Sequence, residues 1–141
     1  TIHKHKTHID ERGFFREIFR FNENFKKIEI GQLSHSLVNQ GVIKSWHGHK
    51  YQYQWNYVIS GYIKVALFDN RKRSSTYRKI LEIDVENSIE NATSYFFPPG
   101  VMHGYECIKG PINIIYVTSG TYDLDDEIRK TKTDLNLDYH F

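Results

Sequence analysis

The sequence predicts an all-β protein, a sandwich or jelly roll, and three observations point to it. Apolar and polar residues alternate along several segments, while sustained helical periodicity is nearly absent. Turn-forming residues recur at short intervals. Aromatic residues make up 15% of the chain, a high share that is typical of β-rich proteins. With 141 residues, the chain is expected to form one domain over residues 1–141.

The expected strands follow one another along the chain. Alternation with period two begins at residues 28–33, recurs loosely over residues 62–68 and is clean over residues 81–85. Residues 57–59 and 114–117 are short apolar runs, which are typical of strands buried on both faces. Short strands at this spacing indicate a sandwich or jelly roll.

Turns and one helix complete the predicted elements. Turns are expected at Ser60-Gly61, Asp69-Asn70, Pro98-Pro99-Gly100, Lys109-Gly110-Pro111 and Ser119-Gly120. Residues 122–130 alone have a helical pattern, with acidic residues early and Arg129-Lys130 late, the order that the helix dipole favours. The predicted fold class is therefore all-β with a short C-terminal helical segment.

Composition excludes several classes of partner. The net charge of +2 gives no electrostatic case for binding nucleic acid or a membrane surface. The single cysteine, Cys107, cannot form a disulfide within the chain, and no apolar signal segment is visible at residues 1–11. We therefore expect a cytoplasmic protein.

Three histidines and a glutamine form the first candidate site. His47 and His49 are separated by one residue, so both imidazoles point to the same face of a strand. Gln54 can come from the next strand, and His103, after Pro98-Pro99-Gly100, from a distant one. With Gly41 and Gly61, this spacing resembles the two-part motif of the cupin superfamily, a double-stranded β-helix. Three imidazoles and an amide could hold a divalent cation, so a metal-dependent cupin is one hypothesis.

A narrower resemblance covers residues 10–129. The segments 10–17 (DERGFFRE), 41–47 (GVIKSWH), 69–77 (DNRKRSSTY) and 98–105 (PPGVMHGY) resemble, in this order, motifs of the dTDP-4-dehydrorhamnose 3,5-epimerase family. Tyr116, thirteen residues after His103, falls where that family keeps its catalytic tyrosine. Several motifs in one order are more specific than the histidine pattern alone.

The resemblance implies an isomerase that uses no metal or other cofactor and acts on a nucleotide-linked 4-keto-6-deoxy sugar. His47 would abstract the acidic proton beside the ketone, and Tyr116 would return a proton from the opposite face. Substrate-binding residues implied in the same way are Arg12, Phe15, Glu17, Gln32, Lys44, His49, Gln54, Arg71 and His103. The family also implies a homodimer that exchanges N-terminal strands.

Two positions differ from the family, and one role is open. The family's arginine before the base is Lys44 here, and its enolate-stabilising lysine is Gln54. Candidates for a carboxylate that orients His47 are Asp69 and Glu106. Besides the metal-dependent cupin, two alternatives stay open: a nucleotide-sugar 3,4-ketoisomerase, whose His-x-His-Lys run resembles residues 47–50, and a homologue that binds sugar nucleotides without catalysis.

Overall fold

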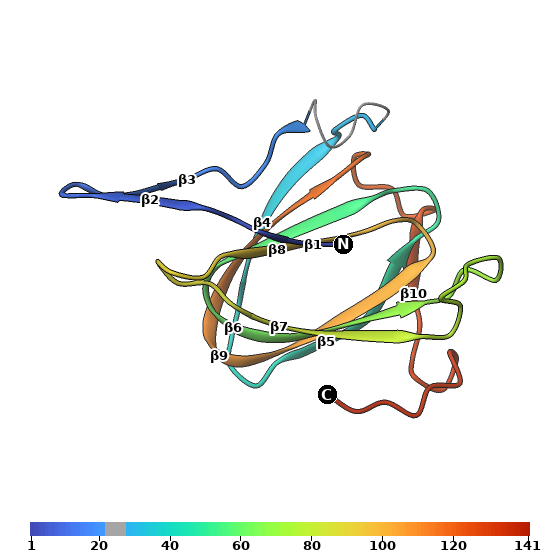
Figure 1. Ribbon diagram of the computed structural model, residues 1–141. Coiled ribbons are helices and arrows are strands. Elements are labelled where there is room, and N and C mark those ends of the chain that lie inside the picture. Colours follow the sequence, from blue (N-terminus) through green and yellow to red (C-terminus); the bar gives the residue numbers. More distant parts are fainter. Residues whose placement is uncertain (22–27) are drawn as a thin grey trace.

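A computed structural model gives the structure of the chain, and it describes residues 1–21 and 28–141 (Figure 1). The described residues form these strands: β1 (Ile2–Lys4), β2 (Thr7–Asp10), β3 (Gly13–Arg16), β4 (Gln32–Val38), β5 (Ile43–His49), β6 (Gln54–Asp69), β7 (Ile80–Glu86), β8 (Thr93–Phe97), β9 (Val101–Thr118) and β10 (Glu127–Arg129). All the strand pairs are antiparallel. The predicted all-β fold is confirmed.

The two long strands, β6 and β9, pair along most of their length and divide the sheet into two layers. The first half of β6 lies between β8 and the second half of β9, which in turn pairs with β4. The second half of β6 lies between β7 and the first half of β9, which pairs with β5. Strands β1 and β10 extend the first and second layer, respectively. Two layers that share bent strands make a jelly roll.

Bends replace two of the expected turns. Ser60-Gly61 lies inside β6 and Lys109-Gly110-Pro111 inside β9, where the register between the strands shifts repeatedly. Gly61 has a φ of 91°, which a residue with a side chain rarely adopts. Bulges of this kind bend a strand without ending it, so each strand passes from one layer into the other. The prediction of short strands was wrong here, whereas Asp69-Asn70, Pro98-Pro99-Gly100 and Ser119-Gly120 do follow strand ends.

The predicted C-terminal helix is also wrong. Residues 124–126 form a turn, and β10 follows it. Arg129 pairs with His47 and Glu127 with His49 across the edge of β5. A helix of nine residues is marginal in water, whereas pairing with β5 satisfies the backbone groups of an exposed edge. The strand at 28–33 likewise begins later than expected, at Gln32.

The core lies between the two layers. Val58, Ile63, Val65 and Ile112 are at most 1% exposed and pack with other apolar residues of β6, β7, β8 and β9. A second cluster on the other side of β5 and β6 joins Trp46 and Phe68 to residues near the C-terminus. Their burial supplies the main driving force for folding and fixes the strands that carry the site.

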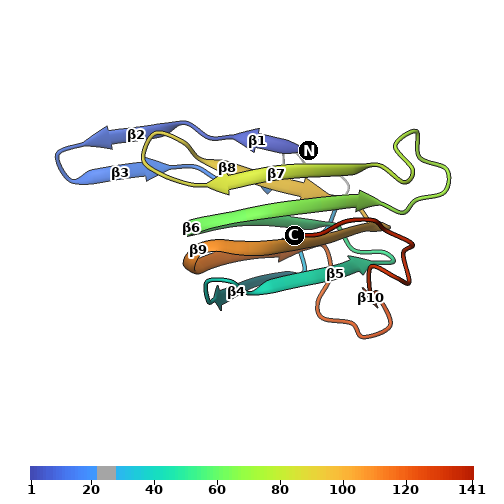
Figure 2. The same ribbon diagram turned by 90° about the horizontal axis from the view of Figure 1, so that it is seen from below.

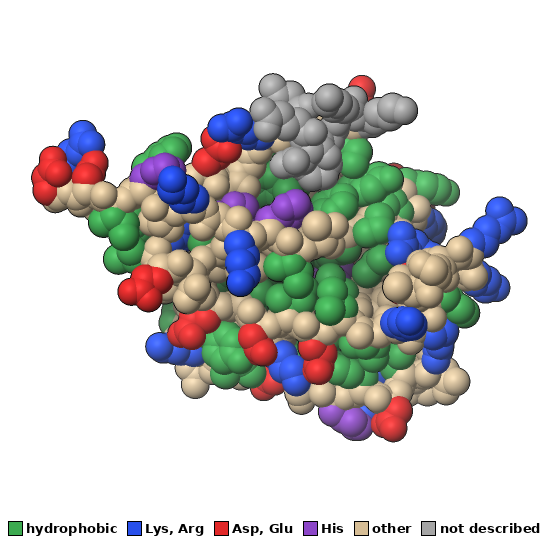
Figure 3. All heavy atoms as spheres, viewed as in Figure 1, with side chains coloured by type: hydrophobic (Ala, Val, Ile, Leu, Met, Phe, Trp, Pro, Cys, Tyr) green, Lys and Arg blue, Asp and Glu red, His purple; other side chains and the backbone are tan. Residues whose placement is uncertain are grey.

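The hairpin of β2 and β3 lies outside both layers. It projects from the barrel that the two layers form, as both ribbon views show (Figures 1 and 2). Its tip is charged (Figure 3). The apolar residues Ile9, Phe14 and Phe15 on it are more than half exposed. Its base is tied to the barrel, where Arg16 donates a hydrogen bond to the hydroxyl of Tyr57 at 2.8 Å. In the described ranges, no helix has the length and apolar character needed to cross a membrane.

Candidate active site

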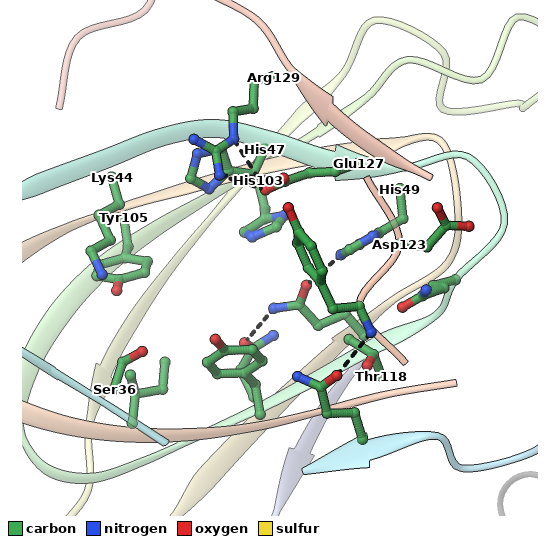
Figure 4. A pocket seen from close by; sticks show the side chains of 18 residues that line it. Ser36, Lys44, His47, His49, His103, Tyr105, Thr118, Asp123, Glu127 and Arg129 are labelled. Carbon is green, nitrogen blue, oxygen red and sulfur yellow. Dashed lines mark hydrogen bonds and ion pairs between the residues drawn. The ribbon is translucent and has the colours of Figure 1, made fainter. Parts of the chain in front are cut away.

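A cavity of about 330 Å³ opens between the two layers. Its walls come from β4, β5, β6, β9 and β10 and from the loop before β10 (Figure 4). Seven residues predicted from the sequence line it: Gln32, Lys44, His47, His49, Gln54, His103 and Tyr116. The alternation of side chains explains the grouping, because His47 and His49 share one face of β5 and His103 pairs with His47 from β9.

His47 is a partly buried imidazole among charged groups. Burial and the nearby charge of Arg129 lower its pKa below the ordinary value of 6.5, while the charge of Glu127 opposes this effect. Lys44 adds to the lowering from the other end of the same strand. The ring of His47 is therefore neutral at neutral pH, the form that accepts a proton.

His103 is buried behind His47. The centroids of the two rings are 6.0 Å apart, and the ring of His103 also lies against Phe97. Burial lowers the pKa of His103 to about 3, so the ring is uncharged. Its Nδ1 atom has no hydrogen-bond partner among the described residues. A buried ring nitrogen without a partner is costly, and a polar group of a bound molecule would satisfy it.

His49 is held on both sides of its ring. Nδ1 lies 2.7 Å from Oδ2 of Asp126, and Nε2 lies 3.0 Å from Oε1 of Gln54. Gln54 donates from Nε2 to Oδ1 of Asn56 at 2.9 Å. Both ring nitrogens of His49 are thus engaged, and neither is free to bind a metal. Across residues 1–21 and 28–141, no group of three or more His, Cys, Asp or Glu side chains is arranged to hold a metal ion.

Two tyrosines face the cavity from β9. Tyr116 lies in the layer opposite His47, and its backbone pairs with Asn56 of β6. Tyr105 lies in the first half of β9, where burial, followed by the proximity of Tyr116, raises its pKa to about 12. Tyr105 therefore stays protonated and is a hydrogen-bond donor at neutral pH.

Four predicted substrate-binding residues lie outside this cavity. Arg12 is at the tip of the hairpin and pairs with Asp10, while the side chain of Phe15 is 65% exposed on β3. Glu17 pairs with Arg20 at 2.6 Å. Arg71 pairs with Asp69 at 2.7 Å in the turn after β6. The chain does not bring these four side chains to its own cavity.

Neither carboxylate suggested as a partner of His47 lies beside it. Asp69 accepts hydrogen bonds from Arg71, Ser74 and Thr76, and the bond from Arg71 is the main reason that the pKa of this carboxyl lies far below its usual range. Glu106 is absent from the cavity wall, since it follows Tyr105 and therefore points to the other face of β9. Glu127 is instead the carboxylate whose charge acts on His47.

Sequence reasoning missed several residues of the site. Two of them carry a signal in the sequence: Tyr105 and Asn56 come two residues after His103 and Gln54, so strand alternation places each pair on one face. Asp126, Glu127 and Arg129 carried no such signal. The segment 122–130 was predicted to be a helix, and a helix there would not pair with β5. Their position depends on the pairing of β10 with β5.

Comparison with known proteins places this site in a family context. The family model described as dTDP-4-dehydrorhamnose 3,5-epimerase matches residues 1–141. The spore coat polysaccharide biosynthesis protein SpsL of Bacillus subtilis is 37% identical over 131 residues, which cover 92% of this chain and 84% of that protein. A dTDP-4-dehydrorhamnose 3,5-epimerase of Methanothermobacter thermautotrophicus is 28% identical over 141 residues, covering 95% of this chain and 75% of that protein.

Solved structures share the fold. The 3'-monoepimerase ChmJ of Streptomyces bikiniensis, solved in complex with dTDP-quinovose, aligns with a TM-score of 0.86 and 17% identity over 98% of this chain and 72% of that one. The epimerase RmlC of Legionella pneumophila, solved with dTDP-4-keto-L-rhamnose, aligns with a TM-score of 0.82 and 23% identity over 98% of this chain and 78% of that one. At these identities the likeness establishes the common jelly roll.

Proposed function

The chain belongs to the dTDP-4-dehydrorhamnose 3,5-epimerase family, and we propose that it epimerises a nucleotide-linked 4-keto-6-deoxy sugar. The family match, the named relatives and the chemistry of the cavity support this proposal. The observation that carries it is the placement of His47 and Tyr116 in opposite layers of the same cavity. A planar intermediate held between them would meet a base on one face and an acid on the other.

The proposed reaction begins at a carbon next to the ketone. Neutral His47 takes the proton of the C–H bond, the electron pair of that bond forms a C=C bond, and the ketone oxygen becomes an enolate oxygen. Tyr116 then donates its hydroxyl proton to the same carbon from the opposite face, which restores the ketone with inverted configuration. The phenolate and the imidazolium exchange protons with solvent to complete the cycle.

Binding of the nucleotide is assigned to the mouth of the cavity. Lys44 lines the cavity and has no ion-pair partner among the described residues, so it would neutralise charge on the diphosphate. Gln32 and His103 line the same cavity and offer polar atoms to the substrate. Deoxysugar or cell-surface polysaccharide biosynthesis is the proposed context, in keeping with the name of the relative SpsL.

We further propose that the active protein is a homodimer in the cytoplasm. The exposed hairpin carries Arg12 and Phe15 away from the cavity of its own chain, so in a dimer these side chains could reach the cavity of the partner. Exchange of N-terminal strands in the family supports that arrangement. Cys107 is buried and forms no disulfide, which fits a reducing compartment.

The ketoisomerase alternative has one observation in its favour. His49 lies two residues from His47 on the same face, and Asp126 supports it as a further acid or base. The two reactions share an enolate but differ in the atom that receives the proton. NMR of the sugar ring separates a 3-keto isomer from an epimer.

Deuterium incorporation tests the proposal. A dTDP-linked 4-keto-6-deoxy sugar incubated with the protein in heavy water should gain deuterium next to the ketone, and NMR should show inverted product. Exchange no faster than in an enzyme-free control, for several 4-keto sugars, would leave a binding protein without catalysis.

A further inference from the structure

A buried carboxylate anchors a line of hydrogen bonds that ends in the cavity. Asp126 is 1% exposed, and its Oδ1 accepts the backbone N–H of Tyr51 at 2.6 Å. Its Oδ2 lies 2.7 Å from Nδ1 of His49. A carboxylate oxygen accepts hydrogen bonds, so Nδ1 of His49 is the donor in this pair.

The other side of the His49 ring also meets an acceptor. Nε2 of His49 lies 3.0 Å from Oε1 of Gln54, and the amide nitrogen of Gln54 donates to Oδ1 of Asn56 at 2.9 Å. The carbonyl oxygen of Gln54 therefore faces the imidazole, and the hydrogen between them belongs to His49. Both ring nitrogens of His49 therefore face an oxygen atom that accepts hydrogen bonds.

Asn56 ends the line with an unused donor. This residue is 3% exposed, and its Nδ2 atom has no hydrogen-bond partner in residues 1–21 and 28–141. Asn56 lies among the residues that line the cavity, and its backbone is directly opposite Tyr116 on β9. Buried amide hydrogens are nearly always paired in folded proteins, so a free one at a cavity wall indicates a bound acceptor.

We propose that Asp126, His49, Gln54 and Asn56 form a hydrogen-bonded line in which His49 donates from both ring nitrogens and the N–H of Asn56 is presented to the ketone oxygen of the sugar. This inference rests on the proposed function and assigns the group that stabilises the enolate. As His47 removes the proton, negative charge grows on the ketone oxygen. Asn56 donates to that oxygen, while Gln54 and His49 polarise the donor from behind.

The direction of the line depends on the second proton of His49. With a single proton on Nδ1, Nε2 would become an acceptor, and the amide of Gln54 would turn to donate to it. Asn56 would then turn as well and present its carbonyl oxygen to the substrate. An oxygen at this position repels an enolate. Asp126, His49 and Gln54 are therefore positioning residues, and Asn56 is the group that contacts the substrate.

Substitution of Asn56 is the direct kinetic test. Asn56→Asp keeps the oxygen that accepts from Gln54 and replaces the N–H by a second oxygen. Deuterium exchange into a dTDP-linked 4-keto-6-deoxy sugar should fall about 100-fold, the scale of losing one donor to a developing oxyanion. The dissociation constant for dTDP alone should stay within about twofold, because dTDP has no ketone. Exchange by Asn56→Asp at the wild-type rate would overturn the inference.

Asp126→Asn tests the anchor against a matched control. It removes the charge that holds the second proton of His49 and should slow exchange about 10-fold or more. Asp125→Asn makes the same change in charge one residue away, at an exposed side chain outside the cavity, and should exchange at the wild-type rate. Equal rates for the two variants would contradict the role of Asp126.

NMR of the ring nitrogens tests the line without any turnover. In wild-type protein labelled with ¹⁵N-histidine, long-range proton–nitrogen spectra should show hydrogens on both nitrogens of His49, and Asp126→Asn should lose one of them. A bare Nε2 in the wild type would overturn the inference, whether or not the protein is active. Absence of wild-type exchange together with a doubly protonated His49 would instead count against the proposed epimerisation alone.

Discussion

The cavity and the N-terminal hairpin differ in what holds their side chains. His47, His49 and His103 lie on strands whose backbones pair on both edges and whose far sides pack on an apolar core. The hairpin carries Arg12 in its turn and Phe15 on β3, and among the described residues its two short strands pair only with each other. The neighbouring strands and the core fix the geometry of the cavity. The hairpin instead exposes apolar and charged side chains to solvent.

This contrast explains why residues inferred from one family resemblance divide into two groups. Those on the barrel strands reach the cavity, whereas the residues on or next to the hairpin (Arg12, Phe15 and Glu17) and Arg71 in the turn after β6 do not. In the proposed dimer, the hairpin of a second chain would complete a site that needs both groups. Substitutions in the two regions should show whether the cavity performs the chemistry and the hairpin only binds.

The largest effect is expected from loss of the base. His47→Asn keeps a side chain that forms hydrogen bonds but cannot accept the substrate proton. Deuterium exchange should fall about 1,000-fold or to the enzyme-free rate, since a positioned general base contributes roughly 10²–10⁴-fold. Proton NMR in heavy water measures the exchange.

An exposed histidine provides the control for this variant. His35 lies on β4, its Nε2 contacts Oδ1 of Asn113 at 3.0 Å, and it does not line the cavity. His35→Asn should exchange at the wild-type rate. If His47→Asn also kept that rate, the cavity would lose its assigned role in proton abstraction.

Tyr116→Phe should separate the two proton transfers. The substrate proton is still removed by His47, so deuterium exchange should change by no more than a few fold. Inverted product should fall about 100-fold, because the acid on the opposite face is gone. Tyr77→Phe, a hydroxyl loss outside the cavity, should leave both rates unchanged. A parallel fall of exchange and inversion in Tyr116→Phe would show that the tyrosine is also needed when His47 removes the substrate proton.

Strand alternation and motif order predicted much of the cavity but little of its supporting contacts. His47, His49 and Gln54 were found because alternation and spacing are local properties of the sequence. Asp126 was missed because its contact with His49 spans 77 positions and depends on the turn before β10. Acidic residues followed by basic ones favour a helix locally, but the open edge of β5 favours a strand there. Tertiary pairing overrode the local preference.

The exposed hairpin is expected to contribute to binding of the nucleotide. Arg12→Ala should weaken dTDP binding about 10-fold, the loss of a charge-assisted hydrogen bond. Its thermal unfolding without ligand should match that of wild type, because the exposed pair of Arg12 and Asp10 adds little to stability. Calorimetric titration and thermal unfolding measure the two quantities.

Mixing variants tests whether the hairpin serves a partner. In a hybrid dimer of Arg12→Ala and His47→Asn chains, one cavity has an intact His47 and receives an intact Arg12 from the other chain. After unfolding and refolding as a mixture, about a quarter of the sites should be restored. Activity equal to the sum of the separate variants would assign Arg12 to its own chain or to no site.

The smallest expected effect is a shift in the pH profile of kcat/KM caused by Arg129 and Glu127 on the cavity wall. Burial and Arg129 lower the pKa of His47, so kcat/KM should rise with pH and level off with a midpoint below the ordinary 6.5. Arg129→Gln removes a cation that disfavours the imidazolium, so the midpoint should move up; Glu127→Gln removes a charge that favours it, so the midpoint should move down. Because the side chain of Arg129 is 71% exposed, salt should screen its effect, and the profiles of wild type and Arg129→Gln should converge at high ionic strength. Shifts in the same direction for both variants would mean that the profile reports a group other than His47, since opposite charges act on one imidazole with opposite signs.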